Sequence, residues 1–442
     1  MDFAGDAAEA EKDAQDLSVI GAGAAGLATA IFAARNSARR IVCLDSARRI
    51  GAKILVSGGS RCNVTNRVVT EHDFWGGSSR FVRRVLRAFP EIRAIEFFAE
   101  LGVALHEEED GKLFPDSNSS RTVLNALTRE AERLEIELVT GERVDSIVKD
   151  GAVFLTTTDS GRTITSHSVA LCTGGRSLPK TGSDGFGYEL ARHFGHHCIE
   201  PVPALAPLLF DGWEDLAGIT HLATLTLRVD GRHTARLTGS FLWTHFGASG
   251  PVALNMSRHW HRAHDGGHQC EVSLNVCPGE TFESLDTWLR TESQTRPRSQ
   301  VGTIVATRLP AAVGERWLTA AGVPHDVTMA HLDREARQRV VRALLDTVVP
   351  VRGSRGFNYA EVTAGGVSLD EVDSATMESR RCPGLYFAGE ILDVDGRLGG
   401  FNFQWAWSSA WVAAQAIARA QSTGRVPRRA RSTGAGPAKE HK

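Results

Sequence analysis

Short apolar runs alternate with helix-length stretches over the first part of the chain. Leu17–Ile20 and Arg40–Leu44 have the length of strands, and the apolar stretch Leu27–Ala34 between them has the length of a helix. Strand, helix and strand in this order predict a parallel sheet with a covering helix. Further strands are predicted at Ile136–Val139, Arg143–Val148, Val153–Thr158 and Val169–Cys172. Helical patterns are predicted around Ser79–Leu101 and Thr122–Leu134.

The pattern changes after Pro201, where the predicted strands are no longer separated by helices. Three strands are predicted there, at Leu225–Val229, Ala235–Leu242 and Cys270–Val276. A group of helical stretches follows, at Glu283–Thr291, Val301–Leu309, Glu315–Ala320 and Asp333–Leu345. Strand character returns at Val362–Val367 and Gly384–Phe387, before a last helix at Phe403–Ala420. We therefore expect the first and last thirds of the chain to build one domain, with the middle inserted into it.

Composition and charge exclude several classes of protein. The net charge of −2 gives no global sign of a nucleic-acid partner, and none is expected. No apolar run approaches the ~20 residues of a membrane span, so no membrane association is expected. The seven cysteines are odd in number and contain no Cys-x-x-Cys, which argues against a disulfide framework, a zinc site or a redox pair. The acidic N-terminal residues lack a secretory signal pattern, and a cytoplasmic location is expected.

A glycine-rich turn lies directly between the first predicted strand and the first predicted helix. It reads Gly21-Ala-Gly23-Ala-Ala-Gly26, the spacing of a dinucleotide-binding fingerprint. Gly21 permits the tight turn, Gly23 lets a pyrophosphate approach the backbone, and Gly26 lets helix and strand pack closely. The helix N-terminus attracts the phosphates. Asp45, at the end of the next strand, is expected to bind a pair of ribose hydroxyls. A merely glycine-rich turn is the alternative, and the surrounding strand, helix and acid argue against it.

Residues 51–66, GAKILVSGGSRCNVTN, are dense in small and hydrogen-bonding side chains. We expect this segment to be a loop that wraps a phosphate or a flavin ring, with Lys53 and Arg61 adding positive charge. The alternative is an ordinary ordered turn. Cys62 has no general base identifiable beside it, so we interpret it as a small buried residue rather than a nucleophile.

Two strand ends in the second half of the chain complete the predicted site. The strand at Val169–Cys172 ends in Thr173-Gly174, and the strand before Gly389 leads into GEILDVDGRLGGFNFQWAWSSA, residues 389–410. Asp393 is expected to hold the ribityl or phosphate part of a flavin. A calcium loop is the alternative, and it is rejected because the residue at its twelfth position is Gln404 rather than a bidentate acid. No metal is expected, and the tryptophans of this segment are expected to pack its helix.

Together these segments resemble one family of FAD-dependent oxidoreductases, the aminoacetone-oxidase-like or BaiN/YhiN-type flavoproteins. The resemblance is carried by Gly21–Leu27, Lys53–Asn66, Thr173–Tyr188, Thr244–Pro251, Glu361–Val367, Thr376–Ser379 and Gly384–Trp407. The sequence departs from the family at Ser60, where glycine is usual, and at Asp45, where glutamate is common.

The resemblance implies an α/β fold with a Rossmann-like, two-dinucleotide-binding FAD domain. A β-barrel-like domain interrupts it and is itself interrupted by a small helical domain. The expected limits are 17–200 and 366–421 for the FAD domain, 201–280 and 346–365 for the barrel-like domain, 281–345 for the helical insert, and 1–16 and 422–442 for disordered tails. The expected cofactor-binding residues are Gly21, Gly23, Ala24, Ala25, Gly26, Asp45, Lys53, Ser57, Gly58, Arg61, Asn63, Val144, Thr173, Gly174, Gly389, Glu390, Asp393, Gly399, Gly400, Phe401 and Asn402.

The sequence defines the cofactor more closely than it defines the reaction. The resemblance implies an enzyme that acts on a small organic substrate, either oxidising an amino-ketone or amine or reducing an enone double bond with NAD(P)H. A flavin-binding redox sensor or assembly partner without catalysis is the alternative. His245 is the candidate acid–base residue because imidazole exchanges protons near neutral pH. No second dinucleotide fingerprint is evident, so either NAD(P)H binds transiently or another acceptor closes the cycle.

Overall fold

A mixed seven-stranded sheet forms the core of the first body of the protein. In this computed structural model, which describes residues 14–36, 38 and 40–422, its strands are β1 (Gln15–Ile20), β2 (Ile41–Asp45), β7 (Glu137–Thr140), β8 (Val144–Asp150), β9 (Val153–Thr158), β10 (Thr163–Leu171) and β20 (Leu385–Phe387). β7, β2, β1 and β10 run parallel in this order, and β20 joins β10 in the same direction. The antiparallel strands β9 and β8 extend the sheet from the first half of β10. Segments from both ends of the chain therefore share one sheet, as the pattern predicts.

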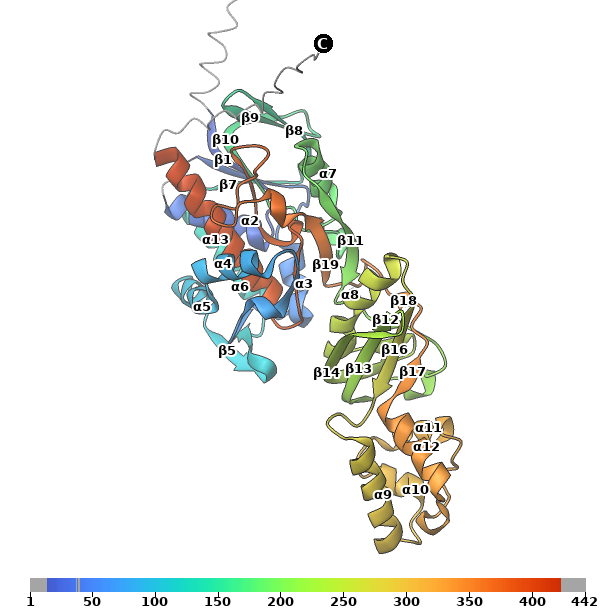
Figure 1. Ribbon diagram of the computed structural model, residues 1–442. Coiled ribbons are helices and arrows are strands. Elements are labelled where there is room, and N and C mark those ends of the chain that lie inside the picture. The colour runs from blue at the N-terminus through green and yellow to red at the C-terminus, as the bar shows by residue number, and fades with distance from the viewer. Residues whose placement is uncertain (1–13, 37, 39, 423–442) are drawn as a thin grey trace, which may run out of the picture.

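Helices α2 (Ala24–Arg35) and α13 (Phe401–Ser422) pack against each other in the same body (Figure 1). Both are rich in alanine on their buried faces, which lets two backbones approach closely. The other helices of this body are α3 (Ala52–Ser60), α4 (Ser79–Ala88), α5 (Glu91–Glu100), α6 (Ser120–Arg133) and α7 (Phe186–His193). The helical pattern around Ser79–Leu101 is thus divided into two helices, α4 and α5. Pro90 lies between α4 and α5, and the residue before a proline is disfavoured in helical conformation.

Two small sheets of short strands also belong to this body. β3 (Thr65–Asn66), β6 (Lys112–Pro115) and β5 (Leu105–Glu108) form a three-stranded sheet, and β4 (Phe74–Gly76) pairs with β21 (Val394–Gly396). The pairing of β4 with β21 joins the segment before α4 to the segment before α13.

The second body is built on an antiparallel sheet of seven strands. In spatial order these are β17 (Thr347–Val349), β16 (Cys270–Asn275), β13 (Thr220–Val229), β14 (Arg232–Thr244), β15 (Gly247–Ser249), β12 (Leu208–Leu209) and β18 (Gly353–Ser354). Within the described residues no pairing joins the end strands β17 and β18. Helix α8 (Pro251–Asp265) packs on β13 and β14 and was not predicted from the sequence.

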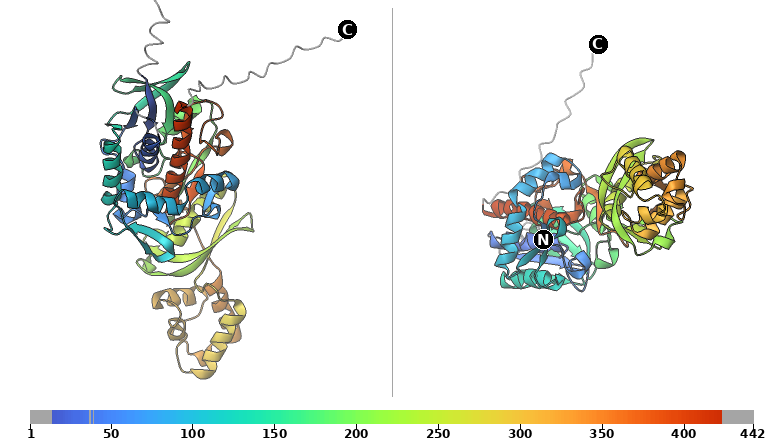
Figure 2. Two further views of the ribbon diagram at one scale, coloured as in Figure 1. Left: turned by 90° about the vertical axis from the view of Figure 1, so that its left-hand side faces the viewer. Right: turned by 90° about the horizontal axis from the view of Figure 1, so that it is seen from below.

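Four helices leave the second sheet between β16 and β17 and form the far end of the molecule (Figures 1 and 2). They are α9 (Phe282–Thr295), α10 (Val301–Val305), α11 (Ala311–Ala320) and α12 (Arg334–Leu345). Their apolar residues join the core of the sheet, where Trp317 lies 4.9 Å from Trp213 and 5.8 Å from Trp243, centroid to centroid. The helical insert and the sheet thus share one hydrophobic core.

An antiparallel strand pair connects the two bodies. β11 (Cys198–Ala204) pairs with β19 (Val362–Val367), and a small apolar cluster around Val202 and Ala364 packs beside it. The expected domain limits at residues 200 and 365 fall inside these two strands. In Figure 1 these two strands lie between the two bodies.

The two predicted tails are only partly covered by the structure. Gln15 and Asp16 belong to β1 and Ser422 to α13, so the expectation of disorder is wrong for these residues. Ala14 is also described and is fully buried, and the rest of both tails lies outside the described residues.

Candidate functional site

A cavity of about 450 Å³ lies at the carboxyl ends of the parallel strands of the first sheet. The lining includes Ile20 at the end of β1, Leu44 next to the end of β2, and Cys172 directly after β10. Ligands bind at this edge of open α/β sheets, where neighbouring strands lead into loops on opposite faces. The volume is typical of a ligand site.

The glycine-rich turn after β1 forms one wall, and its three glycines have distinct surroundings. Gly21 has a φ of +99° and lies so close to Cys172 that a Cβ would come within 2.6 Å of its carbonyl oxygen. A Cβ on Gly26 would come within 1.8 Å of the Gly21 carbonyl oxygen. A Cβ on Gly23 would meet nothing within 4 Å, and Gly23 lines the cavity. Only Gly23 therefore leaves room for a ligand; Gly21 and Gly26 shape the turn.

Helix α2 begins at Ala24 directly after this turn. Its first turn carries no acidic residue, and no side chain caps it. The first N–H groups of a helix lack partners within the helix and carry a partial positive charge. This wall of the cavity therefore fits a pyrophosphate.

Asp45, the last residue of β2, lies beside the glycine-rich turn and lines the cavity. Its carboxylate accepts hydrogen bonds from the N–H groups of Ala22, at 2.7 Å, and Ala47, at 2.8 Å. Burial raises the pKa of Asp45, and these hydrogen bonds oppose the rise. The carboxylate is held in place and keeps lone pairs that can accept from ribose hydroxyls.

The segment expected to be a wrapping loop is instead the kinked helix α3. Ser57, Gly58 and Gly59 depart from helical geometry inside it, and Gly58 and Gly59 have φ values of +54° and +67°. Ser60 also has a positive φ of 67° although it is not glycine. Glycine-rich stretches can therefore continue a helix through a kink, which apolar periodicity alone does not reveal. Cys62 is buried and its pKa is raised to about 12 by loss of hydration, which agrees with a packing role.

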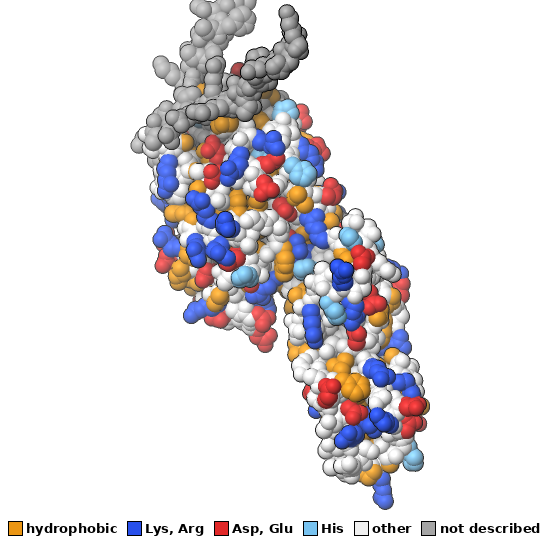
Figure 3. Space-filling view, in the orientation of Figure 1, with side chains coloured by type: hydrophobic (Ala, Val, Ile, Leu, Met, Phe, Trp, Pro, Cys, Tyr) orange, Lys and Arg blue, Asp and Glu red, His pale blue; other side chains and the backbone are white. Residues whose placement is uncertain are grey.

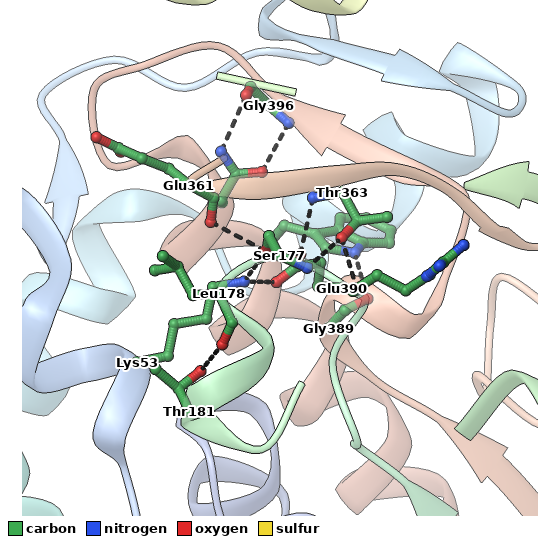
Figure 4. A network of polar contacts seen from close by, with 12 residues as sticks. Lys53, Ser177, Leu178, Thr181, Glu361, Thr363, Gly389, Glu390 and Gly396 are labelled. Atoms are coloured by element: carbon green, nitrogen blue, oxygen red, sulfur yellow. Dashed lines mark hydrogen bonds and ion pairs between the residues drawn. The ribbon is translucent and has the colours of Figure 1, made fainter. Parts of the chain in front are cut away.

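Lys53 of α3 belongs to a polar network rather than acting as a free positive charge (Figure 4). Its ammonium pairs with the Glu390 carboxylate and donates to Ser177 Oγ. Ser177 Oγ and the Thr363 N–H both donate to Glu390 Oε1 at 2.8 Å. The N–H groups of Arg176 and Ser177 in turn donate to Thr363 Oγ1. The network joins α3, the segment after β10, β19 and the turn after β20.

Arg61 and Asn63 line the cavity but are also engaged in the protein. Arg61 pairs with Glu108 at 2.5 Å and lies over the Phe114 ring at 4.1 Å. Asn63 accepts a hydrogen bond from the Leu113 N–H at 3.2 Å. Both therefore fix strand β6 against the cavity wall.

The segment before α13 supplies the last wall. Most of the predicted cofactor-binding residues line the cavity: Gly21, Gly23, Ala24, Ala25, Asp45, Lys53, Ser57, Gly58, Arg61, Asn63, Val144, Thr173, Gly174, Glu390, Gly399, Gly400 and Asn402. Gly26, Gly389, Asp393 and Phe401 do not line it. Gly389, with a φ of +80°, packs close to Ala25, and Phe401 is fully buried.

Asp393 requires a correction, because the structure places it against the second body. Its Oδ1 lies 3.9 Å from Arg262 of α8, and its backbone pairs with Val367 and Gly77. The neighbouring Asp395, 1% exposed, receives two hydrogen bonds from Arg258, at 2.5 and 3.1 Å. Both acids of the supposed calcium loop thus face arginines of α8. Within the described chain, no group of three or more His, Cys, Asp or Glu side chains could hold a metal.

His245 is not brought to the cavity. It is exposed in the turn between β14 and β15, with its ring 5.0 Å from that of Phe246. The sequence interpretation missed Glu361, which lines the cavity, and Ser177 and Thr363, which donate hydrogen bonds to the cavity residue Glu390. All three lie within motifs that carried the resemblance. The polar residues within these motifs were the signal that could have pointed to the site. The choice of His245 rested instead on the chemistry of histidine alone.

The lining fits the expected dinucleotide on two independent observations. Gly23 leaves open space at the N-terminus of α2, where a side chain would take up the room that a phosphate needs. Thr173 Oγ1, in the cavity wall, is buried without a hydrogen-bond partner, so a ligand group can satisfy it.

None of the described helices has the length and apolar character needed to cross a membrane.

Comparison with known proteins gives matches over nearly the whole chain. A family model described as HI0933-like protein Rossmann domain matches residues 15–416. Ribosomal RNA dihydrouridine synthases of Escherichia coli (strain K12) and Haemophilus influenzae are 34% and 32% identical, covering 92% and 91% of this chain and 99% and 98% of those proteins. A 3-dehydro-bile acid delta(4,6)-reductase of Clostridium scindens is 31% identical, covering 91% of this chain and 98% of that protein.

Proposed function

Because the chain belongs to the family of HI0933-like proteins, which are FAD-dependent oxidoreductases, we propose that it reduces a carbon–carbon double bond conjugated to a carbonyl group. NADH or NADPH serves as the electron donor. The sequence left two directions open, and this proposal selects reduction of an enone over oxidation of an amino-ketone or amine.

The chemistry shared by differently named relatives is the observation that carries the proposal. Making dihydrouridine saturates the C5–C6 bond of uracil, which is conjugated to the C4 carbonyl. A delta(4,6)-reductase of 3-dehydro-bile acids acts on double bonds conjugated to a ketone. Both reactions add a hydride to an electron-poor carbon and a proton to its neighbour. A flavin supplies the hydride when bound, and the protein orients the substrate and provides the proton.

The chemistry of the lining suggests how the cavity holds FAD. Gly23 and the N-terminus of α2 hold the pyrophosphate, and Asp45 holds the ribose of the adenosine half. Gly399, Gly400 and Asn402 lie at the start of α13, whose N-terminal dipole stabilises negative charge on the flavin half. The network of Lys53, Glu390 and Ser177 fixes the wall between these two ends.

Uracil in ribosomal RNA is the first substrate to test, and a small enone is the second. The relatives from Escherichia coli and Haemophilus influenzae carry the RNA name, whereas the Clostridium scindens relative carries the small-molecule name. The expectation of no nucleic-acid partner rested on net charge, which is a weak guide to local binding. Lys and Arg side chains are mixed with Asp and Glu over the face shown in Figure 3, and Arg80, Arg84 and Arg87 are exposed on α4.

Anaerobic spectroscopy of the purified flavoprotein tests the proposal. NADH or NADPH should bleach the oxidised flavin absorbance, and a substrate with a conjugated double bond should restore it without oxygen. Protein-free ribosomal RNA fragments and a steroid enone are the two substrates to compare. Bleaching that only oxygen reverses would favour an oxidase, and no bleaching by either nucleotide would favour the sensor without catalysis.

A further inference from the structure

One carboxyl group in the cavity is free of the contacts that hold the others. Asp45, Glu142, Asp184 and Glu390 each accept hydrogen bonds from backbone or side-chain donors around the cavity. Glu361 also lines the cavity, and among the described residues its carboxylate has neither a hydrogen bond nor an ion pair. A carboxyl group without a structural task at a ligand site is a candidate for chemistry.

The backbone of Glu361 is nevertheless fixed from two sides. Its N–H donates to the Leu205 carbonyl oxygen at 3.2 Å, and its carbonyl accepts from Ser177 Oγ at 3.3 Å. Ser177 also contacts Lys53 and Glu390, as Figure 4 shows. The side chain therefore starts from a rigid position where the polar network meets the connection between the two bodies.

The surroundings of the carboxyl group favour its neutral form. The side chain is exposed to the open cavity, yet enough protein surrounds it that partial loss of hydration raises the pKa of Glu361, while the positive charge of Lys53 acts in the opposite direction. The Lys53 ammonium is already paired with Glu390, which weakens its effect on a second carboxylate. A carboxylic acid that stays protonated at higher pH can donate a proton to a substrate.

We propose that Glu361 is the catalytic acid that completes reduction of the conjugated double bond. This inference rests on the proposed function. The hydride brings both electrons to the carbon β to the carbonyl, which leaves negative charge shared between the α carbon and the carbonyl oxygen. The Glu361 O–H gives its proton to the α carbon, the new C–H bond forms, and the carboxylate takes a proton from water before the next turnover.

The variant Glu361→Gln removes the proton and keeps the size of the side chain. Reduction of the flavin by NAD(P)H should keep its rate, whereas anaerobic reoxidation by the substrate should slow by about 10²- to 10⁴-fold. In wild type this reoxidation should fall as pH rises through the raised pKa, and in Glu361→Gln it should lose that dependence. Glu361→Asp should restore part of the rate. Glu283→Gln, an exposed acid on α9, is the matched control and should match wild type.

Unfolding gives a readout that does not depend on activity. A carboxyl group with a raised pKa in the folded state binds more protons there than in the unfolded state. As pH rises from below the ordinary pKa of glutamate, wild type should therefore lose stability relative to Glu361→Gln. Glu283→Gln should show the same pH dependence of stability as wild type. Thermal melts of the apoprotein between pH 4 and pH 8 measure this difference.

The outcomes separate the two proposals. If wild type reduces no conjugated double bond, the proposed function fails and the acid role with it. If wild type is active while Glu361→Gln reoxidises at the same rate with the same pH dependence, only the role of Glu361 is overturned. A parallel pH dependence of unfolding in wild type and Glu361→Gln would also contradict the raised pKa.

Discussion

Two glycines of the same turn show why a motif has to be interpreted residue by residue. Gly23 has an ordinary backbone conformation and faces open space, whereas Gly26 packs against the carbonyl of Gly21. The sequence alone predicted these separate roles because the spacing of the fingerprint prescribes them. It could not predict that Lys53 is neutralised by Glu390, since these residues are 337 positions apart. Nor could the sequence predict that the Glu361 carboxylate has no hydrogen bond or ion pair among the described residues, because that depends on which side chains the fold places around it.

Gly23→Val tests the position of the pyrophosphate. A Cβ at this position has no protein atom within 4 Å, so the fold should be retained, while the valine side chain fills the space for the phosphates. We expect FAD affinity to fall by about a hundredfold or more, which corresponds to roughly 3 kcal/mol. Titration of the apoprotein with FAD, followed by flavin fluorescence, measures this.

The control for this prediction is Gly26→Val. Its Cβ clashes with backbone, so the variant should lose thermal stability even without FAD. Normal FAD affinity in a folded Gly23→Val protein would remove the pyrophosphate from this turn.

Helix α8 is the element that the sequence did not reveal. Its segment follows a glycine- and proline-rich stretch, and polar residues interrupt its apolar face. The structure explains these polar residues, because Asn255, Arg258 and Arg262 contact the first body. Asn255 accepts a hydrogen bond from the Leu398 N–H at 2.8 Å, and Arg258 pairs with Asp395. Such a face is visible only once its partner acids are placed beside it. α8 therefore positions the segment that leads into the cavity wall at Gly399.

Removing the Arg258 guanidinium should destabilise the protein strongly. Arg258→Met would leave Asp395 buried with its charge uncompensated, which typically costs about 3–5 kcal/mol. Arg290→Ala, which removes an exposed arginine 3.8 Å from Asp286, should cost no more than about 1 kcal/mol. Urea unfolding followed by tryptophan fluorescence compares the two variants. Equal, small effects would show that the Arg258–Asp395 pair does not hold α8 in place.

His259 on the same helix predicts a pH dependence of stability. Burial, with the nearby charge of Arg258, lowers its pKa from 6.5 to about 4, and its ring packs edge-on against Trp75 at 5.0 Å. A histidine buried in the neutral form binds fewer protons when folded, so its stabilising contribution is present above pH 6.5 and is lost as pH falls toward 4. The loss of stability is at most about 3–4 kcal/mol, at about 1.36 kcal/mol per pKa unit.

The comparison variant for this effect is His259→Phe, which cannot take up the proton. Its stability should fall less than that of wild type between pH 7 and pH 4.5 in urea unfolding. His72→Gln, which changes an exposed histidine, should follow wild type. If wild type and His259→Phe lose stability in parallel, His259 is not buried in the neutral form.

At the scale of the whole molecule, the sequence predicted the architecture better than the details of the site. The family and the Rossmann-like fold class are confirmed by the match over residues 15–416. The split of one domain between both ends of the chain was visible because strand–helix alternation returns only after residue 362. The course of β11 and β19 between the bodies could not be predicted, since two strands that are far apart along the chain, such as Cys198 and Val367 at their paired ends, leave no local signal.

Conversion of the substrate itself tests the central claim most directly. The holoprotein is incubated anaerobically with NADH or NADPH and either a ribosomal RNA fragment or a steroid enone, and the products are measured by mass spectrometry. We predict that one substrate gains two hydrogen atoms at the conjugated double bond, with one reduced nicotinamide consumed for each bond saturated. Nicotinamide oxidation that requires oxygen and leaves both substrates unchanged in mass would contradict the account.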